Sequence, residues 1–360
     1  MNMNAKIVVA LVLACLVVSS VFAALPWPRN TAETSEEAVV KAMVEKSIRS
    51  TQLALEVSVY DADGNLKYHE YDPDDPLTQN FIRLLSAFLL NYDSDACISM
   101  LDEGNSWRSV NIYISDPMTM TAINLYRGTP QLMIGIGSGS GTPSASSYAL
   151  FGKVGEYYVP TSYAYSNGWM NFSVSIPIGT TTTITNVGAF YQCTTSNYKF
   201  MMAHDSITPV SVVPGDTIAI TYCFYFAPQF TENLCKIIFY TFCPSSFKPS
   251  SFTLVDINGS TISVKARCEN NYLFDNDATP AVPNRLHFGT GSSQVSRNSF
   301  KLDYSVGNNM IYSLCNTTAV WGGSTYIASS SVTIAELGVV GYLSDVNGAQ
   351  KQVLYWRDLL

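Results

Sequence analysis

Few residues in this sequence have the types and spacing that acid, base or metal chemistry needs. The histidines are His69, His204 and His287, and none is paired at the spacing of metal ligands. His204-Asp205 has the composition of an acid–base pair, but Arg357-Asp358 stands at a similar place near the end of the chain. An aspartate that recurs beside a changeable basic residue favours a structural hydrogen bond or ion pair over catalysis.

Catalytic motifs are also missing. Neither a G-x-S-x-G sequence nor a Walker A sequence occurs, and the glycine-rich stretch IGIGSGSG at 134–141 lacks the third glycine of a dinucleotide-binding fingerprint. The carboxylates are scattered, so no glycosidase pair can be nominated. We therefore expect no catalytic residue, no cofactor and no metal site, and a protein that is not an enzyme.

One stretch resembles the start of a calcium-binding loop. Asp61, Asp63 and Asn65 have the right spacing, but Leu66 stands where glycine is expected and Asp72 replaces the glutamate at the twelfth position. We interpret DADGN as an ordinary turn of a β-hairpin.

Seven cysteines outside the N-terminal segment are candidates for disulfide bonds. Cys235/Cys243 and Cys223/Cys235 are local candidate pairs, while buried free thiols are the alternative, because connectivity cannot be deduced from sequence. The absence of Cys-x-x-Cys argues against a zinc ribbon. The seven are Cys97, Cys193, Cys223, Cys235, Cys243, Cys268 and Cys315.

The N-terminus indicates export. Lys6 precedes an apolar run from Ile7 to Val18, and small residues lead to Ala23, so we expect a signal peptide over residues 1–23; an uncleaved membrane anchor is the alternative. Export permits disulfides and glycans. The glycosylation sequons begin at Asn171, Asn258 and Asn316.

Composition favours a β-rich protein that does not bind nucleic acid. Charged residues make up 13% of the chain against 47% hydrophobic, with 22 tyrosines, and the net charge of −8 leaves no basic stripe for DNA or RNA. No later stretch reaches the length of a membrane span, so none is expected after signal cleavage.

Three segments recur in order along the chain. Gly137/Gly139 match Gly289/Gly291 at an offset of 152, Gly188 matches Gly338 at 150, and Asp205 matches Asp358 at 153. This recurrence predicts two copies of one module.

Strand and turn patterns predict two tandem antiparallel β-sandwich modules, immunoglobulin-like or jelly-roll-like, after the signal segment. Residues 24–50 form an N-terminal extension with a short helix. Module 1 covers 51–226 and includes an inserted helix over 77–90, which the second copy lacks room for, because Gly259 and Gly289 are much closer than Gly64 and Gly137. A junction spans 227–251, and module 2 covers 252–360.

Module 2 also lacks a match to the strand at Thr217–Phe226. A sandwich without one strand exposes unpaired backbone groups and an apolar groove. We expect the gap to be filled by a strand from the N-terminal segment or from another subunit, as in donor-strand assemblies; a smaller copy with a covered edge is the alternative.

The order of these motifs resembles β-rich tail, fibre and appendage structural proteins of phages and archaeal viruses. The resemblance is carried by Gly137-Ser138-Gly139, Tyr148 to Leu150, Ile184 to Gly188, Asp205 and Pro214 to Tyr222. It implies a role in an appendage or a surface or virion assembly. The export signal departs from phage tail proteins and favours an exported surface filament or appendage subunit, such as an archaeal extracellular filament.

Three functional hypotheses follow. The first is a secreted structural subunit of a pilus-like appendage or surface assembly that forms a homopolymer by strand exchange, at a cell or host surface. The second is a monomeric adhesin or carbohydrate-binding module that uses Trp107, Trp169 or Trp321. The third is a secreted hydrolase, which requires a pair of carboxylates in a cleft.

Overall fold

The structure is a computed structural model of the chain. It describes residues 43, 46–47, 50–73, 77–90, 98–111, 123–124, 131–193, 198–244, 246–265, 285–303, 305–310, 312–315, 320–323 and 334–360. The expected signal peptide, Cys97, Cys268 and Asn316 lie outside the described residues.

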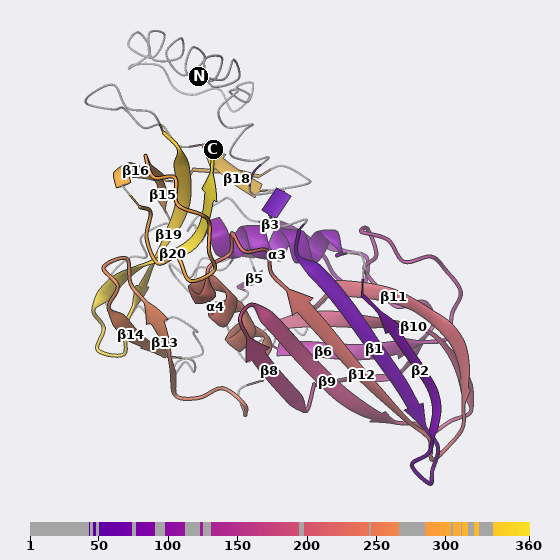
Figure 1. Cartoon of the computed structure of the whole chain (residues 1–360). Helices are drawn as coiled ribbons and strands as arrows, with labels where there is room; N and C mark the ends of the chain where they lie inside the picture. Colours follow the sequence, from indigo (N-terminus) through magenta and orange to yellow (C-terminus); the bar gives the residue numbers. More distant parts are fainter. Residues whose placement is uncertain are drawn as a thin grey trace.

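The fold is mainly β, as expected, and nearly all its strand pairs are antiparallel. In the first half, a five-stranded sheet has the order β2-β1-β12-β9-β8 and a four-stranded sheet has the order β11-β10-β6-β7 (Figure 1). The strands of the first sheet are β1 (Gln52–Tyr60), β2 (Leu66–Asp72), β8 (Ser162–Ser166), β9 (Trp169–Pro177) and β12 (Thr217–Tyr225). Those of the second are β6 (Gln131–Gly137), β7 (Lys153–Tyr158), β10 (Thr182–Cys193) and β11 (Tyr198–Val212).

A small sheet joins β3 (Ile98–Leu101), β4 (Trp107–Asn111) and β5 (Ile123–Asn124), with β4 and β5 parallel. The second half has a four-stranded sheet of order β16-β15-β19-β20 and two hairpins, β13-β14 and β17-β18. Their bounds are β13 (Ser251–Val255), β14 (Thr261–Lys265), β15 (Arg285–Gly289), β16 (Ser305–Met310), β17 (Tyr312–Cys315), β18 (Val320–Gly323), β19 (Glu336–Ser344) and β20 (Gln350–Leu359).

Alternation of apolar and polar residues positions the strands of the five-stranded sheet. Every second residue of β12 is buried while its neighbours are half-buried, and β9 follows the same period of two. The inward face of β1 consists of alternate apolar residues that are all buried: Leu53, Leu55, Val57 and Val59. Side chains from both sheets of the first half therefore meet in a sandwich-like core.

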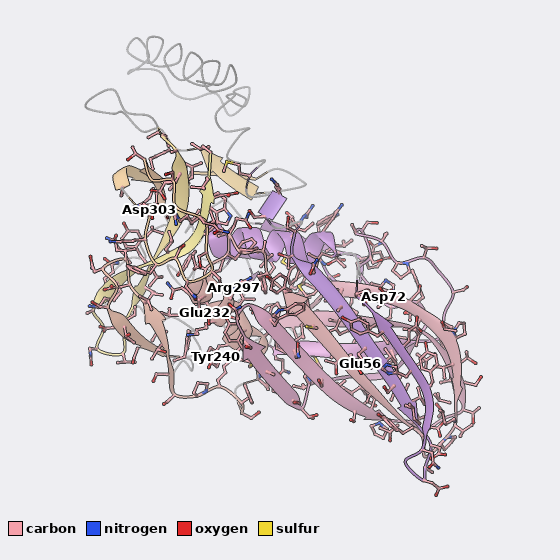
Figure 2. The ribbon with its side chains drawn as sticks, viewed as in Figure 1. Glu56, Asp72, Glu232, Tyr240, Arg297 and Asp303 are labelled. Carbon is pink, nitrogen blue, oxygen red and sulfur yellow. The ribbon has the colours of Figure 1, made fainter. Side chains whose placement is uncertain are left out.

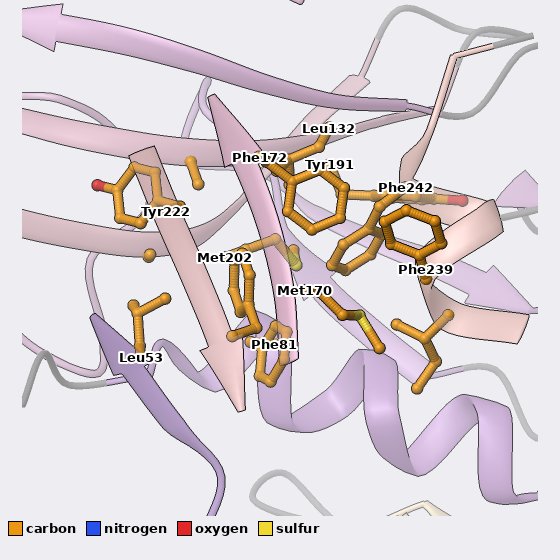
Figure 3. Packing of buried hydrophobic residues seen from close by; sticks show 14 of the residues in the cluster. Leu53, Phe81, Leu132, Met170, Phe172, Tyr191, Met202, Tyr222, Phe239 and Phe242 are labelled. Atoms are coloured by element: carbon orange, nitrogen blue, oxygen red, sulfur yellow. The ribbon is translucent and has the colours of Figure 1, made fainter. Parts of the chain in front are cut away.

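Two helices, α3 (Gln79–Leu90) and α4 (Glu232–Phe242), lie between the sheets of the two halves (Figure 1). Phe81 of α3 stacks on Phe224 with ring centroids 5.4 Å apart, and Phe242 of α4 lies 5.8 Å from Phe172 and 5.7 Å from Tyr191 (Figure 3). Helix α3 also contacts β18 in the second half. Both helices thus pack against strands of the opposite half, and a single hydrophobic cluster runs from β1 to β20.

Both helices begin in the same way. Thr78 donates its hydroxyl to the carbonyl of Met201 on β11 at 2.6 Å, and Thr231 donates to Leu354 on β20 at 2.6 Å. Two residues further on, the Asn80 amide bonds the backbone of Leu101, and the Asn233 amide bonds Val255 in both directions. Helix α4 is therefore the counterpart of α3.

The expectation that the second copy has no such helix is wrong. It compared the Gly259 hairpin with the Gly64 hairpin. Asn233 bonds Val255, just before the Gly259 turn, as Asn80 bonds Leu101, just before the turn at Asp102 to Ser106, so the turn after α3 is the better match. The helix therefore precedes the matching hairpin in both halves and lies within the 227–251 segment that was assigned to a junction. The expected domain boundaries remain a prediction.

Candidate functional site

The polar residues of greatest interest lie under the glycine-rich loop that recurs in each half. In the first half, the Asn186 side chain on β10 accepts a hydrogen bond from the amide of Phe151 at 3.2 Å and donates to the Phe151 carbonyl at 3.1 Å. It also donates to the carbonyl of Gly139 at 3.3 Å. A Cβ atom on Gly137 would lie 2.5 Å from the Asn186 oxygen, so the close approach of loop and strand requires glycine there.

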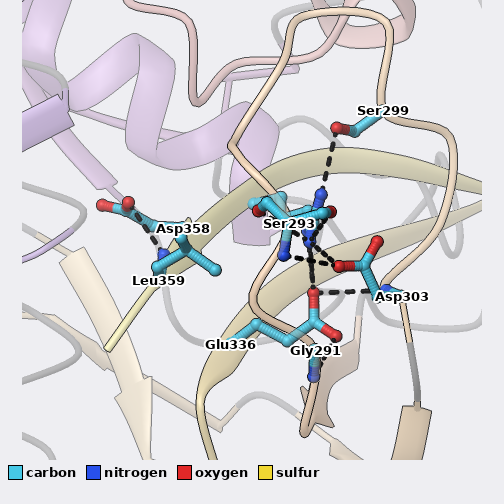
Figure 4. A network of polar contacts seen from close by, with 8 residues as sticks. Gly291, Ser293, Ser299, Asp303, Glu336, Asp358 and Leu359 are labelled. Carbon is cyan, nitrogen blue, oxygen red and sulfur yellow. Dashed lines mark hydrogen bonds and ion pairs between the residues drawn. The ribbon is translucent and has the colours of Figure 1, made fainter.

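Glu336 on β19 holds the same position in the second half. Its carboxylate accepts hydrogen bonds from the amides of Gly291 at 3.0 Å and Asp303 at 3.2 Å (Figure 4). Gly291 and Asp303 match Gly139 and Phe151, each at an offset of 152. A buried side chain thus anchors each loop, with an amide in one half and a carboxylate in the other.

The basic residue on the neighbouring strand differs between the halves together with the side chain that holds the loop. His204 Nε2 lies 3.2 Å from the Asn186 oxygen, whereas Arg357 Nη2 lies 2.7 Å from Glu336 Oε2. Arg357 also reaches Asp303 Oδ2 at 3.0 Å. Burial lowers the pKa of His204 to about 4, so this imidazole is neutral near pH 7 and suits a neutral amide. Arg357 carries a charge and faces carboxylates.

The two recurring aspartates have different environments. Asp205 is buried and accepts a hydrogen bond from the Tyr222 hydroxyl of β12 at 2.6 Å, which joins the two sheets of the first half. Asp358 is half-buried, accepts the amide of Leu359 at 2.9 Å, and has a raised pKa because of burial. The structural role expected for the His204-Asp205 and Arg357-Asp358 pairs therefore agrees with their hydrogen bonds.

In chemical terms, these contacts hold a loop. The named donors and acceptors are directed at backbone amides, carbonyls and one another, so the arrangement fixes the path of the chain between β6 and β7 and between β15 and β16. Among the described residues, no group of three or more histidine, cysteine, aspartate or glutamate side chains is placed to hold a metal ion.

Sequence reasoning missed Asn186 and Glu336 because their residue types differ. A signal was present: each lies two residues before the glycine of a recurring segment, Gly188 or Gly338. Aligning the two repeats and comparing equivalent positions, whatever residue occupies them, would have identified Asn186 and Glu336.

The calcium-like stretch at Asp61 is a turn, as expected. Asp61 Oδ1 accepts the backbone amides of Asp63 at 3.0 Å and Asn65 at 2.8 Å, and these bonds lower its pKa, with the Asn65 side chain contributing most. The same pattern recurs at Asp256 and Asp345, where the amide two residues on and the amide four residues on bond Oδ1 at 2.9 Å. In each of these turns the aspartate carboxylate accepts the backbone amides that close the turn.

The local disulfide candidates are not formed. Cys223, Cys235 and Cys243 are free thiols, and burial raises the pKa of Cys223 to about 11 and that of Cys235 to about 12. Cys235 lies in the first turn of α4 and Cys243 directly follows the helix. Eight residues of helical rise separate them by about 12 Å, beyond the reach of a disulfide. Cys193 and Cys315 lie on β10 and β17.

The described sequons differ in accessibility. Asn171 lies in the middle of β9, paired on both sides, and is half-buried, while Asn258 is exposed in the turn between β13 and β14. Glycosylation at these positions remains a prediction, and the exposed turn is the better acceptor.

Arg297 connects the two halves at their junction. It is buried, and its guanidinium donates to the carbonyls of Phe226 and Phe230, and to Cys235 Sγ at 3.2 Å. Figure 2 shows Arg297 beside Glu232, the first residue of α4, whose backbone amide bonds the Arg297 carbonyl at 2.8 Å. This arginine therefore holds the end of β12, the linker and α4 together.

Among the described residues, β18 is one of the strands of the second half that pair on one side alone. Strand β9 is paired on both sides, by β8 and β12, whereas its counterpart β18 is paired with β17 alone within the described part of the chain. The match is fixed by Trp169 and Trp321, at the offset of 152.

The expected apolar groove is not open along β19 and β20. Leu337, Val339 and Val353 are buried within the chain, and α4 packs against β20. Ser47, from the N-terminal extension and 1% exposed, accepts a hydrogen bond from the buried Trp356 indole at 3.1 Å. Met43 and Ser47 of the chain itself thus pack on this side of the core.

None of the described helices is long and apolar enough to cross a membrane. Comparison with protein-family models, curated proteins and solved structures found no match.

Proposed function

We propose that the chain is a secreted structural subunit of an extracellular filament or surface assembly, built from two tandem modules and polymerising by β-strand addition. The observation that carries the proposal is the pairing of β18, which among the described residues has one neighbour where β9 has two. A strand with unpaired N–H and C=O groups favours addition of another strand.

The first half defines the strand that fits this edge. Strand β12 pairs with β9 over nine residues and supplies the buried side chains Ile218, Ile220, Tyr222 and Phe224. The occupant of the β18 edge should therefore be an extended segment with the same alternation, provided by a second copy of the chain. In the first half a short link joins β11 to β12, and β12 pairs with β9. A strand joined to β20 by a similar link would lie beside β18.

Other features support an assembled, exposed protein. The chain has few charged residues, and its polar centres serve backbone contacts in the loops. Low charge and abundant β-branched and aromatic residues favour close packing of subunits over dispersal. The resemblance to appendage and virion proteins agrees with this role, and so does the expected export signal.

Self-complementation tests the proposal. Residues 208–226 would be appended after Leu360, because Leu360 matches Ile207 at an offset of 153. We expect the parent chain to form filaments or oligomers in negative-stain microscopy and sedimentation, and the fusion to remain monomeric because its β18 edge is occupied in cis.

The matched control carries the same appended segment with Ile218, Ile220 and Tyr222 of the appendage replaced by serine. It should still polymerise, because a strand without apolar side chains gains little from insertion. A parent chain that is monomeric under all conditions, or a fusion that polymerises like its parent, would contradict strand addition.

A further inference from the structure

The outer face of the five-stranded sheet carries an aromatic pair that the core does not use. Trp169 of β9 and Tyr225 of β12 are paired in register, with ring centroids 4.4 Å apart and planes inclined by 31°. Trp169 is 42% exposed, although it lies in a paired strand whose next residue, Met170, is fully buried. A large apolar ring held on a sheet face and left in solvent indicates a contact surface.

The pair is fixed in place. Arg297 places its guanidinium 5.3 Å from the centroid of the Tyr225 ring, and that guanidinium is itself tied to backbone carbonyls of the junction. The turn before Trp169 has Gly168 at a φ of +83°, where a Cβ atom would collide with Arg297. A ring whose orientation is already set loses little entropy when a ligand stacks on it.

Uncharged polar groups flank the rings. Strand register places Ser166 of β8 and Gln52 of β1 in the same row as Trp169 and Tyr225, and both are exposed. The next row of the face holds Ala164, Asn171, Cys223 and Ala54. The Asn171 side-chain oxygen is buried and has no hydrogen-bond partner among the described residues.

We propose that Trp169 and Tyr225, with Gln52 and Ser166 beside them, form a platform that binds a neutral saccharide. An aromatic face attracts the partly positive C–H groups on one side of a pyranose ring, and amide and hydroxyl groups bond the ring hydroxyls. The two rows carry no acidic or basic side chain, and the nearby Arg297 guanidinium is buried and bonded to backbone carbonyls, so the face favours an uncharged ligand. The chain's net charge of −8 disfavours a nucleic acid, which would offer bases to the same ring.

Trp107 serves as a comparison. It is 57% exposed at the start of β4, and the Arg83 guanidinium lies 4.6 Å from its ring centroid. Arg83 is buried on α3 and bonds the carbonyl of Ser99, so this contact ties the small sheet to the helix. Trp107 is therefore a suitable control for Trp169, because it is also exposed but its ring makes a structural contact.

Affinity electrophoresis of the full chain tests the platform. Native gels would contain mannan, dextran, laminarin or hydroxyethylcellulose, each a neutral polysaccharide. We expect at least one to retard the parent chain, the Trp169→Ala variant to lose affinity by about tenfold or more, and Trp169→Phe to retain part of it because a ring remains. Trp107→Ala should bind like the parent, and circular dichroism would verify that each variant is folded.

Two results would overturn the proposal. The first is the absence of retardation by all four polysaccharides, or equal retardation of the parent and Trp169→Ala. The second is a Trp169→Ala variant that changes sedimentation of the chain without changing saccharide binding, because the platform would then belong to a contact between copies. Strand addition at β18 is measured separately, so either proposal can fail alone.

Discussion

Arg357 and Glu336 form a buried ion pair, with Nη2 2.7 Å from Oε2, at the place where His204 and Asn186 form a neutral hydrogen bond in the first half. Each pair holds a glycine-rich loop against its sheet. The two side chains of each pair lie on neighbouring strands, and both members are neutral in the first half and both are charged in the second. Each buried pair therefore has no net charge.

Removing one member of the ion pair should destabilise the chain strongly. Glu336→Ala leaves the Arg357 guanidinium buried with one carboxylate fewer, and we expect a loss of about 3–5 kcal/mol in the free energy of unfolding. Urea denaturation followed by tryptophan fluorescence measures it. The control is Asp303→Asn, because the Asp303 carboxylate is about one-third exposed and its pair with Arg357 should contribute about 1 kcal/mol or less. Equal effects of the two substitutions would refute the burial argument.

The threonines that begin the two helices should contribute alike. Thr231→Val and Thr78→Val keep the shape of the side chain and remove a hydroxyl that bonds a strand carbonyl at 2.6 Å. We expect each to lower stability by about 1–2 kcal/mol. Thr208→Val, at an exposed strand position, should change it by less than about 0.5 kcal/mol. A negligible effect at Thr231 alone would argue against the equivalence of α3 and α4.

Stability should fall in mild acid because of His204. Its pKa in the folded chain is about 4, below the usual 6.5, so the unfolded chain binds more protons between these values and stability declines as the pH falls from 6.5 toward 4. The full effect is about 3 kcal/mol. Urea unfolding of the parent and of His204→Gln across this range measures it, and the variant should lack this part of the decline. Parallel pH profiles would exclude His204 as the cause.

Buried thiols should resist alkylation in the folded chain. The pKa of Cys235 is about 12, and Cys243 is also buried with a raised pKa, so almost no thiolate forms at pH 8. Iodoacetamide labelling with peptide mass spectrometry should modify Cys223, which is half-buried, before the other two, and all three at once in urea. Rapid labelling of Cys235 without denaturant would mean that the Arg297 junction opens.

Patterns with a regular period were readable from the sequence. Strand β12 follows strict alternation, the apolar residues of β1 recur at every second position from Leu53 to Val59, and the helix expected over 77–90 is observed as α3 at Gln79–Leu90. The loop glycines were found because close backbone approach permits no other residue at Gly137. Local chemistry and period determine these features.

Features set by distant contacts were missed. Helix α4 was not recognised, since its Ile, Phe, Tyr and Thr residues favour strands and its apolar face is defined by packing on Phe172 and Tyr191. The N-cap at Thr231 and the acidic Glu232 were a usable signal. Arg297 offered none, because its partners are backbone carbonyls far away in sequence.

The capping of α4 has a consequence for the order of events during synthesis. The Thr231 hydroxyl that caps this helix also donates to the carbonyl of Leu354, which is made more than a hundred residues later. In a growing chain this helix therefore lacks one of its tertiary contacts until the last strand is made. A chaperone that shields such a segment would act before the two halves close, and truncation by a few residues would leave the earlier half without its cover.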